Sequence, residues 1–362
     1  MGHLEKMTSK KIMRMLHPSY LSLRLFFRSW GQFLWAELYN LLVLFTAVYL
    51  LQRYFMFHKL RLWLYWLSVL VVRKFMAGGF CRSDVRLNGC TVVITGADSG
   101  IGKEVAKELA LRGAHLVLGS RDLVKAEQTK KELENLKGSV EIRHLDLSSL
   151  ESVRTFANGL INHKYHIHML LNIAGEMMCP YKETADGLEE QMAVNHLGHF
   201  LLTNMLLPWL THHKPARIIN VAATAHIDGR IPFSDFNYKQ QGYSKWKAYC
   251  NSKLATVLFT RQLARNLKDT NVEAFCANPG VSQSALYRHV LPEFVYKHII
   301  GFLVQTPREA AQTITYCATE AKQDVNFYYS ECSSGWPSDE AMDDDLAQRL
   351  WRESEKLVGL EK

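Results

Sequence analysis

The segment Cys90–Gly102, with the sequence CTVVITGADSGIG, decides the fold class of this chain. Its first six residues form an apolar, β-branched run, which is typical of a buried strand in a parallel sheet. The glycines that follow allow a tight turn close to a pyrophosphate, and a helical pattern, KEVAKELALRG, begins directly after them. A strand, a glycine-rich turn and a helix in this order predict a dinucleotide-binding unit. The turn residues that we assign to the cofactor are Gly96, Ser99, Gly100, Ile101 and Gly102.

The alternation of strand and helix continues along the chain. We expect further strands at Ala114–Gly119, Val140–Leu145, His168–Ile173 and Arg217–Ala222, and helices at Asp122–Lys137 and Ser148–His163. Strands that alternate with helices of this length predict a parallel sheet with helices on both faces. The fold class is therefore α/β, a single doubly wound parallel Rossmann sheet, and its strand ends line the edge where ligands bind.

Composition and charge set limits on the partners. The chain has 362 residues, of which 48% are hydrophobic and 22% charged. These fractions exclude a disordered or collagen-like chain and permit a sizeable core. The net charge of +8 is concentrated before residue 87, where 13 Lys and Arg stand against three acidic residues. This distribution favours contact with an anionic membrane surface, and no nucleic-acid partner is expected.

A long apolar stretch follows the basic N-terminus. Trp30–Leu51 has 22 residues, roughly 33 Å as a helix, which is enough to cross the hydrocarbon layer of a bilayer. Leu62–Val72 has 11 residues, roughly 16 Å, and does not span alone. We expect a membrane-anchoring helical segment here; the alternative is a buried helix of a soluble protein. A spanning helix with an interfacial one and a shallow hairpin both fit, and positive charge on both sides does not fix the orientation.

The expected organisation is a basic lead at 1–29, a hydrophobic membrane anchor at 30–77, a linker at 78–89, the Rossmann domain at 90–330 and a helical tail at 331–362. The seven cysteines are scattered and show no CxxC or HxxxH spacing. This pattern predicts reduced thiols, a catalytic domain that faces the cytosol, and no metal site. We expect the acidic run Asp343–Asp345 to cap the N-terminus of the tail helix.

The end of the second expected strand indicates the cofactor. An NAD site presents a carboxylate to the ribose 2′-hydroxyl at this point, whereas this chain has Ser120 followed by Arg121. An arginine pairs with a 2′-phosphate, and an acid there would repel it. We therefore predict NADP(H). Lys103, just after the glycine turn, either assists or is ordinary solvated surface.

Tyr249 and Lys253 lie four residues apart in the segment YCNSK, at the start of a helical pattern, and therefore share one helix face. An ammonium group close to a tyrosine favours the phenolate, which a tyrosine needs in order to act as an acid or base near neutral pH. This spacing alone is common in helices. Behind a nucleotide-binding array it predicts a catalytic pair.

With these motifs the chain resembles the short-chain dehydrogenase/reductase family between Asn88 and Leu360. The matching segments are TGADSGIG (Thr95–Gly102), NIAG (Asn172–Gly175), Asn195, YCNSK (Tyr249–Lys253) and NPG (Asn278–Gly280). Within the family the chain is most similar to the microsomal retinol dehydrogenases. This similarity rests on SRD (Ser120–Asp122), NHLGHFLLT (Asn195–Thr203), AYCNSKLATVLFT (Ala248–Thr260) and the tail LAQRLWRESEKLVGL (Leu346–Leu360).

The resemblance implies a role for each matched position. Tyr249 would be the general acid/base, and Lys253 would lower the pKa of Tyr249 and hold the nicotinamide ribose. Asn195 would position a relay water, and Asp146 would touch the adenine. The remaining positions assigned to the cofactor are Leu147, Asn172, Ala174, Gly175, Pro279 and Gly280.

The chain departs from the family pattern at the catalytic serine. The family motif NVSS-x-A-H reads NVAATAH here, and the serine that polarises the substrate oxygen corresponds to Ala223. Loss of one such donor typically costs about 10²–10³ in rate. Thr224 carries a hydroxyl one residue later, but neighbouring residues of a strand face opposite sides. Thr224 therefore substitutes only if the backbone turns at Ala223.

Two functions fit these observations. The first is a membrane-anchored oxidoreductase that transfers hydride between NADP(H) and a lipophilic, retinoid-like alcohol or carbonyl compound, at the endoplasmic reticulum or a lipid droplet. The apolar segment Val281–Thr306 lies where the family builds its substrate lid and favours such a substrate, although its residues equally suit ordinary packing. The second is an NADP(H)-binding, catalytically impaired membrane scaffold or sensor. The expected partners are a lipophilic small molecule and membrane lipid, and an oligomer is left open.

Overall fold

The computed structural model describes residues 41–50, 53, 58–212, 215–240, 242–283, 286, 304–323 and 326–361. The chain divides into two units, residues 1–72 and 73–362. In the first unit, residues 41–50 are helical and α3 (His58–Met76) begins. No helix within the described residues has the length and hydropathy needed to cross a bilayer. Most of the predicted anchor run Trp30–Leu51 lies outside the described residues.

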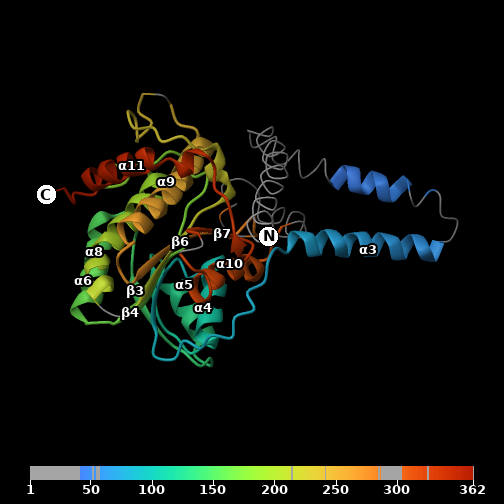
Figure 1. The fold of residues 1–362 in the computed structure, drawn as a ribbon, viewed down its shortest axis with the longest axis horizontal. Helices are drawn as coiled ribbons and strands as arrows, with labels where there is room; N and C mark the ends of the chain where they lie inside the picture. Colours follow the sequence, from blue (N-terminus) through green and yellow to red (C-terminus); the bar gives the residue numbers. More distant parts are fainter. Residues whose placement is uncertain are drawn as a thin grey trace, which may run out of the picture. The chain divides into compact units, whose positions relative to one another are not determined.

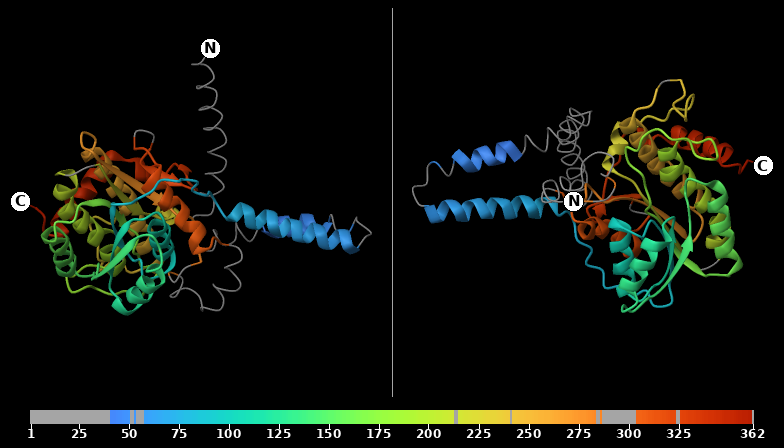
Figure 2. Two further views of the ribbon diagram at one scale, coloured as in Figure 1. Left: turned by 90° about the horizontal axis from the view of Figure 1, so that it is seen from below. Right: turned by 180° about the vertical axis from the view of Figure 1, so that it is seen from behind.

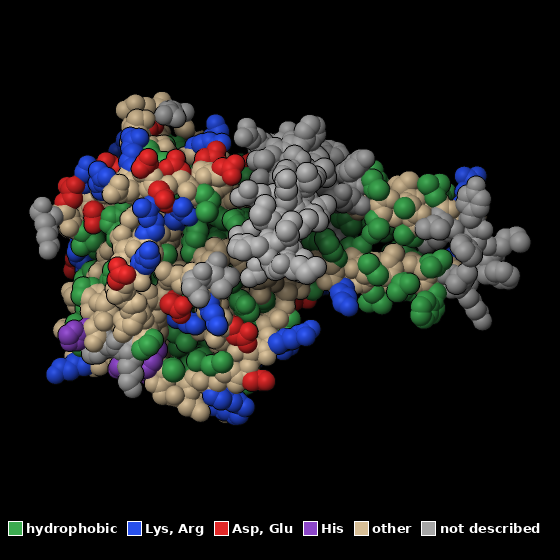
Figure 3. Space-filling view, viewed as in Figure 1, with side chains coloured by type: hydrophobic (Ala, Val, Ile, Leu, Met, Phe, Trp, Pro, Cys, Tyr) green, Lys and Arg blue, Asp and Glu red, His purple; other side chains and the backbone are tan. Residues whose placement is uncertain are grey.

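The helix α3 exposes large apolar side chains, and Figure 3 shows apolar surface on this helical segment. These side chains are Leu62, Trp63, Tyr65, Trp66, Leu67, Leu70, Val71 and Phe75. The first turn of α3 holds no acidic residue, and Arg73 and Lys74 lie in its last turn. Arg73 pairs with Glu309 at the start of α10 (Pro307–Thr319), with Nη2 at 2.7 Å from Oε1.

The second unit is built on an eight-stranded sheet in the order β3-β2-β1-β4-β5-β6-β7-β8 (Figure 1). The strands are β1 (Thr91–Thr95), β2 (His115–Ser120), β3 (Ser139–His144), β4 (Ile167–Asn172), β5 (Ala216–Val221), β6 (Val272–Asn278), β7 (Tyr328–Ser330) and β8 (Ser333–Ser334). The strands β1 to β7 pair in parallel, which confirms the predicted Rossmann-type sheet. The chain crosses from β3 over β1 to β4, so a switch in strand order lies beside β1.

The sheet ends in one strand that the sequence did not predict, because β8 pairs antiparallel with β7. Glu331 and Cys332 connect the two strands, and both have positive φ, at 53° and 55°. Two such residues in succession make the tight turn that suits the twist of a hairpin. Asn and Gly usually occupy these positions, so this pair carries no turn signal in the sequence.

Helices cover both faces of the sheet. Alternate residues of a strand point to opposite faces, and in this sheet both sets pack apolar side chains against helices. In β1, Val93 packs with α6 (Leu150–Asn162), α8 (Gly198–His212) and α9 (Lys245–Asn266). On the other face, Val92 and Ile94 pack with α4 (Gly100–Leu111), α5 (Leu123–Leu133) and α10. Figures 1 and 2 show these two helical layers.

The helical tail packs onto the first of these layers. The helix α11 (Asp344–Leu357) is capped by Asp343, whose side chain accepts from the Leu346 N–H, as predicted for the acidic run. Trp351 of α11 contacts the rings of Phe200 and Phe259. The tail is therefore part of the core that holds α8 and α9.

Candidate active site

The residues predicted to form the site follow the carboxyl ends of strands β1 to β6 or lie on the helices beside them. The glycine turn joins β1 to α4, Arg121 follows β2, and β3 is followed by Asp146 and Leu147. The end of β4 carries Asn172, Ala174 and Gly175. Thr224 follows β5, and β6 is followed by Pro279 and Gly280. Asn195 lies in a π-helical turn, η1 (Ala193–Leu197), and Tyr249 and Lys253 lie in α9. Because these strands are parallel, their carboxyl ends share one edge of the sheet.

The glycine turn packs backbone against backbone. Gly96 has φ of +70°, and a Cβ there would lie 2.7 Å from the Cα of Ala174. A Cβ on Gly102 would likewise clash with the carbonyl oxygen of Gly96. The buried Thr95 hydroxyl accepts from the N–H groups of Ile173 and Ala174, at 3.0 and 3.1 Å. These contacts hold the turn against the end of β4 and leave no room for a side chain inside it.

The N-terminus of α4 fits the pyrophosphate of a dinucleotide. Ser99 is its N-cap residue, but the Ser99 side chain makes no capping hydrogen bond, and the first turn of α4 holds no acidic residue. By contrast, Asp122, Ser149 and Ser244 each cap the helix that follows with a side-chain oxygen. N–H groups at a helix N-terminus attract an anion. A helix N-terminus without a side-chain cap, next to a glycine turn that admits no side chain, therefore fits a nicotinamide dinucleotide.

We expect Gly96→Ala to destabilise the second unit by about 2–4 kcal/mol, since the alanine meets both an unfavourable φ and the backbone of Ala174. Gly89→Ala is the matched control, because Gly89 has φ of +77° but nothing lies within 4 Å of its added Cβ. The control should cost about 1–2 kcal/mol. Urea unfolding of the two variants measures the difference, and equal losses would contradict the close approach described for the turn.

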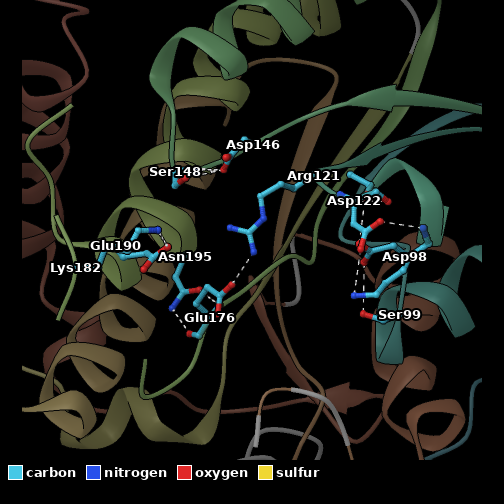
Figure 4. A network of polar contacts seen from close by, with 12 residues as sticks. Asp98, Ser99, Arg121, Asp122, Asp146, Ser148, Glu176, Lys182, Glu190 and Asn195 are labelled. Carbon is cyan, nitrogen blue, oxygen red and sulfur yellow. Dashed lines mark hydrogen bonds and ion pairs between the residues drawn. The ribbon is translucent and has the colours of Figure 1, made fainter. Parts of the chain in front are cut away.

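Beside the turn, the end of β2 carries a small polar network (Figure 4). The Ser120 hydroxyl donates to Asp98 Oδ2 at 2.9 Å. The next residue, Arg121, extends across the sheet edge, and its Nη2 lies 3.5 Å from Oε1 of Glu176, which directly follows the NIAG motif. At the end of β3, Asp146 accepts from both the N–H and the hydroxyl of Ser148. Within the described residues, the sheet edge where an adenosine would bind thus holds Arg121 together with several carboxylates.

Tyr249 and Lys253 lie on successive turns of α9, which begins one turn earlier than the sequence pattern indicated. Both side chains are buried, and the Lys253 Nζ lies 5.9 Å from the centre of the Tyr249 ring. Lys253 also donates to the carbonyl oxygen of Val221 at the end of β5. Burial lowers the pKa of Lys253 to about 8, so the ammonium form still predominates at neutral pH.

Asn195 joins this pair to the end of β4. Its Oδ1 accepts from the N–H of Glu176, and its Nδ2 donates to the carbonyl oxygen of Glu176 and to the Ser252 hydroxyl. A Cβ on Gly175 would lie 3.0 Å from Asn195 Oδ1 and 3.5 Å from Lys253 Nζ. The structure therefore brings Gly175, Asn195 and Lys253 together. The π turn that carries Asn195 is a feature that recurs at functional sites.

The segment that lacks the catalytic serine stays extended through Ala223 and turns only from Thr224 onward. Ala223 is extended and caps a 3-10 helix, η2 (Thr224–Asp228), that begins directly after it. The Thr224 hydroxyl accepts from Asn278 Nδ2 at 3.1 Å, and Asn278 Oδ1 accepts from the Gly280 N–H. The Thr224 hydroxyl keeps its own proton, which is available to another acceptor.

The sequence of this chain is similar to those of known proteins. A family model described as short chain dehydrogenase matches residues 90–293. Retinol dehydrogenase 12 of Homo sapiens is 46% identical over 293 residues, covering 80% of this chain and 92% of that protein. The chain belongs to the short-chain dehydrogenase family. Retinol dehydrogenase 13 of Homo sapiens is 43% identical over 304 residues, covering 81% of this chain and 92% of that protein, which confirms the resemblance to retinol dehydrogenases.

A solved structure of the same fold supports the family assignment. The crystal structure of an uncharacterized protein from Mycobacterium Paratuberculosis is 36% identical to this short-chain dehydrogenase, with a TM-score of 0.65. The match covers 78% of this chain and 98% of that one.

Among the described residues three histidines are buried, and the sequence predicted no role for two of them, His199 and His226. His199 Nε2 lies 2.9 Å from the Thr95 hydroxyl, and burial lowers the pKa of His199 to about 3. His226 Nε2 accepts from the Ser338 N–H, so its Nδ1 carries the proton and donates to the Ala223 carbonyl at 2.8 Å. His199 lies four residues after Asn195, and this spacing puts the two residues on the same helix face. The spacing was the only indication in the sequence that His199 lies near the site.

Proposed function

We propose that this short-chain dehydrogenase is a membrane-anchored oxidoreductase that transfers hydride between NADP(H) and a lipophilic, retinoid-like alcohol or carbonyl compound. The observation that carries the proposal is the placement of Tyr249 and Lys253 on successive turns of α9, with Lys253 beside Gly175 and Asn195. These residues share the sheet edge with a glycine turn that fits a dinucleotide.

The residues proposed to hold the cofactor follow the ends of β1, β2 and β3 or lie on α9. The uncapped N-terminus of α4 would bind the pyrophosphate, and Arg121 would pair with the 2′-phosphate that distinguishes NADP(H) from NAD(H). Asp146 would contact the adenine, and Lys253 the nicotinamide ribose. When bound, the nicotinamide would supply or accept the hydride.

Tyr249 is the proposed proton carrier. In the reduction direction its hydroxyl would donate a proton to the oxygen of the substrate carbonyl, and in the oxidation direction its phenolate would accept one. Lys253 stabilises the phenolate electrostatically, because its ammonium lies 5.9 Å from the ring centre in a buried environment. The hydrogen bond from Lys253 to Val221 fixes the ammonium in that place.

The substrate class follows from the relatives and from the N-terminal unit. The curated relatives reported above are named retinol dehydrogenases, and retinoids are lipophilic. The helix α3 exposes eight large apolar side chains, which favour contact with lipid rather than water. Together with the apolar run Trp30–Leu51, these side chains support anchoring at a membrane, which we propose to be the endoplasmic reticulum or a lipid droplet, with the second unit in the cytosol.

A direct assay tests this proposal. The full chain, purified in mild detergent, is mixed with NADPH and all-trans-retinal, long-chain aldehydes or sterol ketones, and cofactor oxidation is followed by absorbance. We expect turnover with at least one of these carbonyl compounds, and faster turnover with NADPH than with NADH. Tight NADPH binding without turnover of any compound in the panel would favour the impaired scaffold instead.

Thr224 is the proposed substitute for the missing serine. We expect Thr224→Val to lower kcat/KM by about 10²–10³, the usual loss for one oxyanion donor, and Ala223→Ser to raise it less than about tenfold. Thr224→Ser keeps the hydroxyl and serves as the matched control, with activity close to that of the unmodified chain. A gain of 10²-fold or more in Ala223→Ser, with no loss in Thr224→Val, would contradict this role and indicate a site impaired at Ala223.

A further inference from the structure

Glu176 is an acidic residue held firmly at the edge where the dinucleotide is proposed to bind. Its backbone N–H and carbonyl both bond to the Asn195 side chain, at 2.8 and 2.9 Å. Its own side chain is only 11% exposed. The backbone of Glu176 is therefore fixed directly after Gly175, at the end of β4, and its carboxylate is largely shielded from solvent.

Arg121 reaches this carboxylate from two strands away. It follows β2, Glu176 follows β4, and β1 with its glycine turn lies between them in the sheet order β2-β1-β4. In Figure 4 the Arg121 side chain extends over this edge toward Glu176, and the contact measures 3.5 Å between Nη2 and Oε1. The arginine side chain is 53% exposed, so it can reorient at little cost.

The neighbouring cation has a carboxylate of its own. Lys182 Nζ lies 2.7 Å from Glu190 Oε1, whose side chain is about as buried as that of Glu176. Bonding to Glu190 raises the pKa of Lys182, while Arg121 acts in the opposite direction. Within the described residues, Arg121 is the cation that pairs with Glu176 and also directly follows β2, where an anion could reach it.

We infer that Glu176 is a specificity-determining residue, which competes with the 2′-phosphate of the cofactor for Arg121 and so narrows the preference for NADP(H) over NAD(H). This inference rests on the proposed function, in which Arg121 binds the 2′-phosphate. A guanidinium that is paired with Glu176 cannot bind the 2′-phosphate at the same time. The apparent affinity for NADP(H) is therefore reduced in proportion to the fraction of molecules in which the Arg121–Glu176 pair is formed. The cofactor without a 2′-phosphate does not need Arg121 and escapes this competition.

The test is an equilibrium binding series on the full chain, with no turnover required. NADPH and NADH are titrated by calorimetry, and 2′,5′-ADP and 5′-ADP serve as probes that differ only in the 2′-phosphate. We expect Glu176→Gln to tighten binding of NADPH and 2′,5′-ADP about two- to fivefold, the range for a partly exposed ion pair. Binding of NADH and 5′-ADP should stay within about 1.5-fold of that of the unmodified chain.

Two further variants isolate the competition. In an Arg121→Met background, Glu176→Gln should no longer favour the ligands that carry a 2′-phosphate, because the shared cation is gone. Glu190→Gln removes a similarly buried carboxylate that pairs with Lys182, and it should leave the ratio of NADPH to NADH affinity unchanged.

The outcomes separate this inference from the proposed function. A chain that binds NADPH more tightly than NADH, but whose affinity ratio is the same with Glu176→Gln, would overturn the inference alone. An equal gain for all four ligands would also overturn it, since that result indicates general charge repulsion. A chain that binds neither NADPH nor NADH would remove the proposed function and the inference with it.

Discussion

Replacing Tyr249 by phenylalanine is expected to lower kcat/KM for carbonyl reduction by about 10²–10⁴, the usual contribution of a positioned acid or base. The substitution removes one oxygen from a buried ring and leaves the ring itself in place beside Lys253. The hydrogen bond from Lys253 to Val221 does not involve that oxygen, so the ammonium should keep its position. NADPH affinity should therefore change little while the chemical step is lost.

The control for this experiment is Tyr238→Phe. Tyr238 is also buried, and its hydroxyl accepts from Asn251 Nδ2 on α9, but it has no place in the proposed chemistry. We expect it to cost stability and to leave kcat within about fivefold, since a lost buried hydrogen bond acts mainly on folding. Steady-state kinetics and NADPH titration on both variants make the comparison. Equal turnover in the unmodified chain and Tyr249→Phe would remove the proton-transfer mechanism.

The sheet could be predicted from the sequence because its strands are short, buried and rich in β-branched residues. The expected strand Cys90–Thr95 and the observed β1 differ by one residue at the start, and the strand predicted at Arg217–Ala222 is β5 shifted by one. Such runs fit only a sheet covered on both faces. The glycine turn was equally readable, since close backbone packing at Gly96 admits no side chain.

The missed elements depend on contacts that the sequence does not display. The hairpin of β7 and β8 has two positive-φ residues that are neither glycine nor asparagine. The π turn that carries Asn195, directly before α8, was not predicted from the sequence either. Gly198, the first residue of α8, approaches Leu147 so closely that a Cβ would lie 2.6 Å from its carbonyl oxygen. Only the fold places Leu147 there.

The same limit applies to the candidate site. Motifs located Tyr249 and Lys253, because their spacing alone puts them on one helix face. They did not reveal Glu176, which matters only because Arg121 reaches it from another strand. They did not reveal His226 either, whose tautomer depends on Ser338, 112 residues further along the chain. Polar partners brought together by tertiary packing leave no periodic trace in the sequence.

Acid is expected to destabilise the protein steeply, by about 3–4 kcal/mol between pH 6 and pH 5, because three buried histidines are neutral in the folded state. Burial lowers the pKa of His196 and His199 to about 3 and that of His226 to about 4. In the unfolded chain each returns to about 6.5. As the pH falls below 6.5 the unfolded state therefore binds up to three more protons than the folded state, and the free energy of unfolding decreases until the folded pKa values are reached.

Each of the three histidines makes a different tertiary contact, two of them next to site residues. Protonation should therefore break these contacts as well as lower the free energy of unfolding. His199 bonds to Thr95 next to the glycine turn, His226 bonds to the carbonyl oxygen of Ala223, and His196 bonds to Ser354 of α11. Glu189 acts in the opposite direction, since burial raises its pKa, and it offsets at most one of the three protons. Urea unfolding at a series of pH values gives the slope directly.

Single substitutions decide whether these histidines are the cause. His226→Gln should remove about one third of the slope between pH 6 and pH 5, because one of the three protons no longer differs between the two states. His163→Gln is the control: this side chain is exposed, so its substitution should leave the slope as it is. A free energy of unfolding that stays constant from pH 6.5 to pH 5 would contradict the assignment of three neutral buried histidines. A slope that persists unchanged in His226→Gln would show instead that other groups take up the protons.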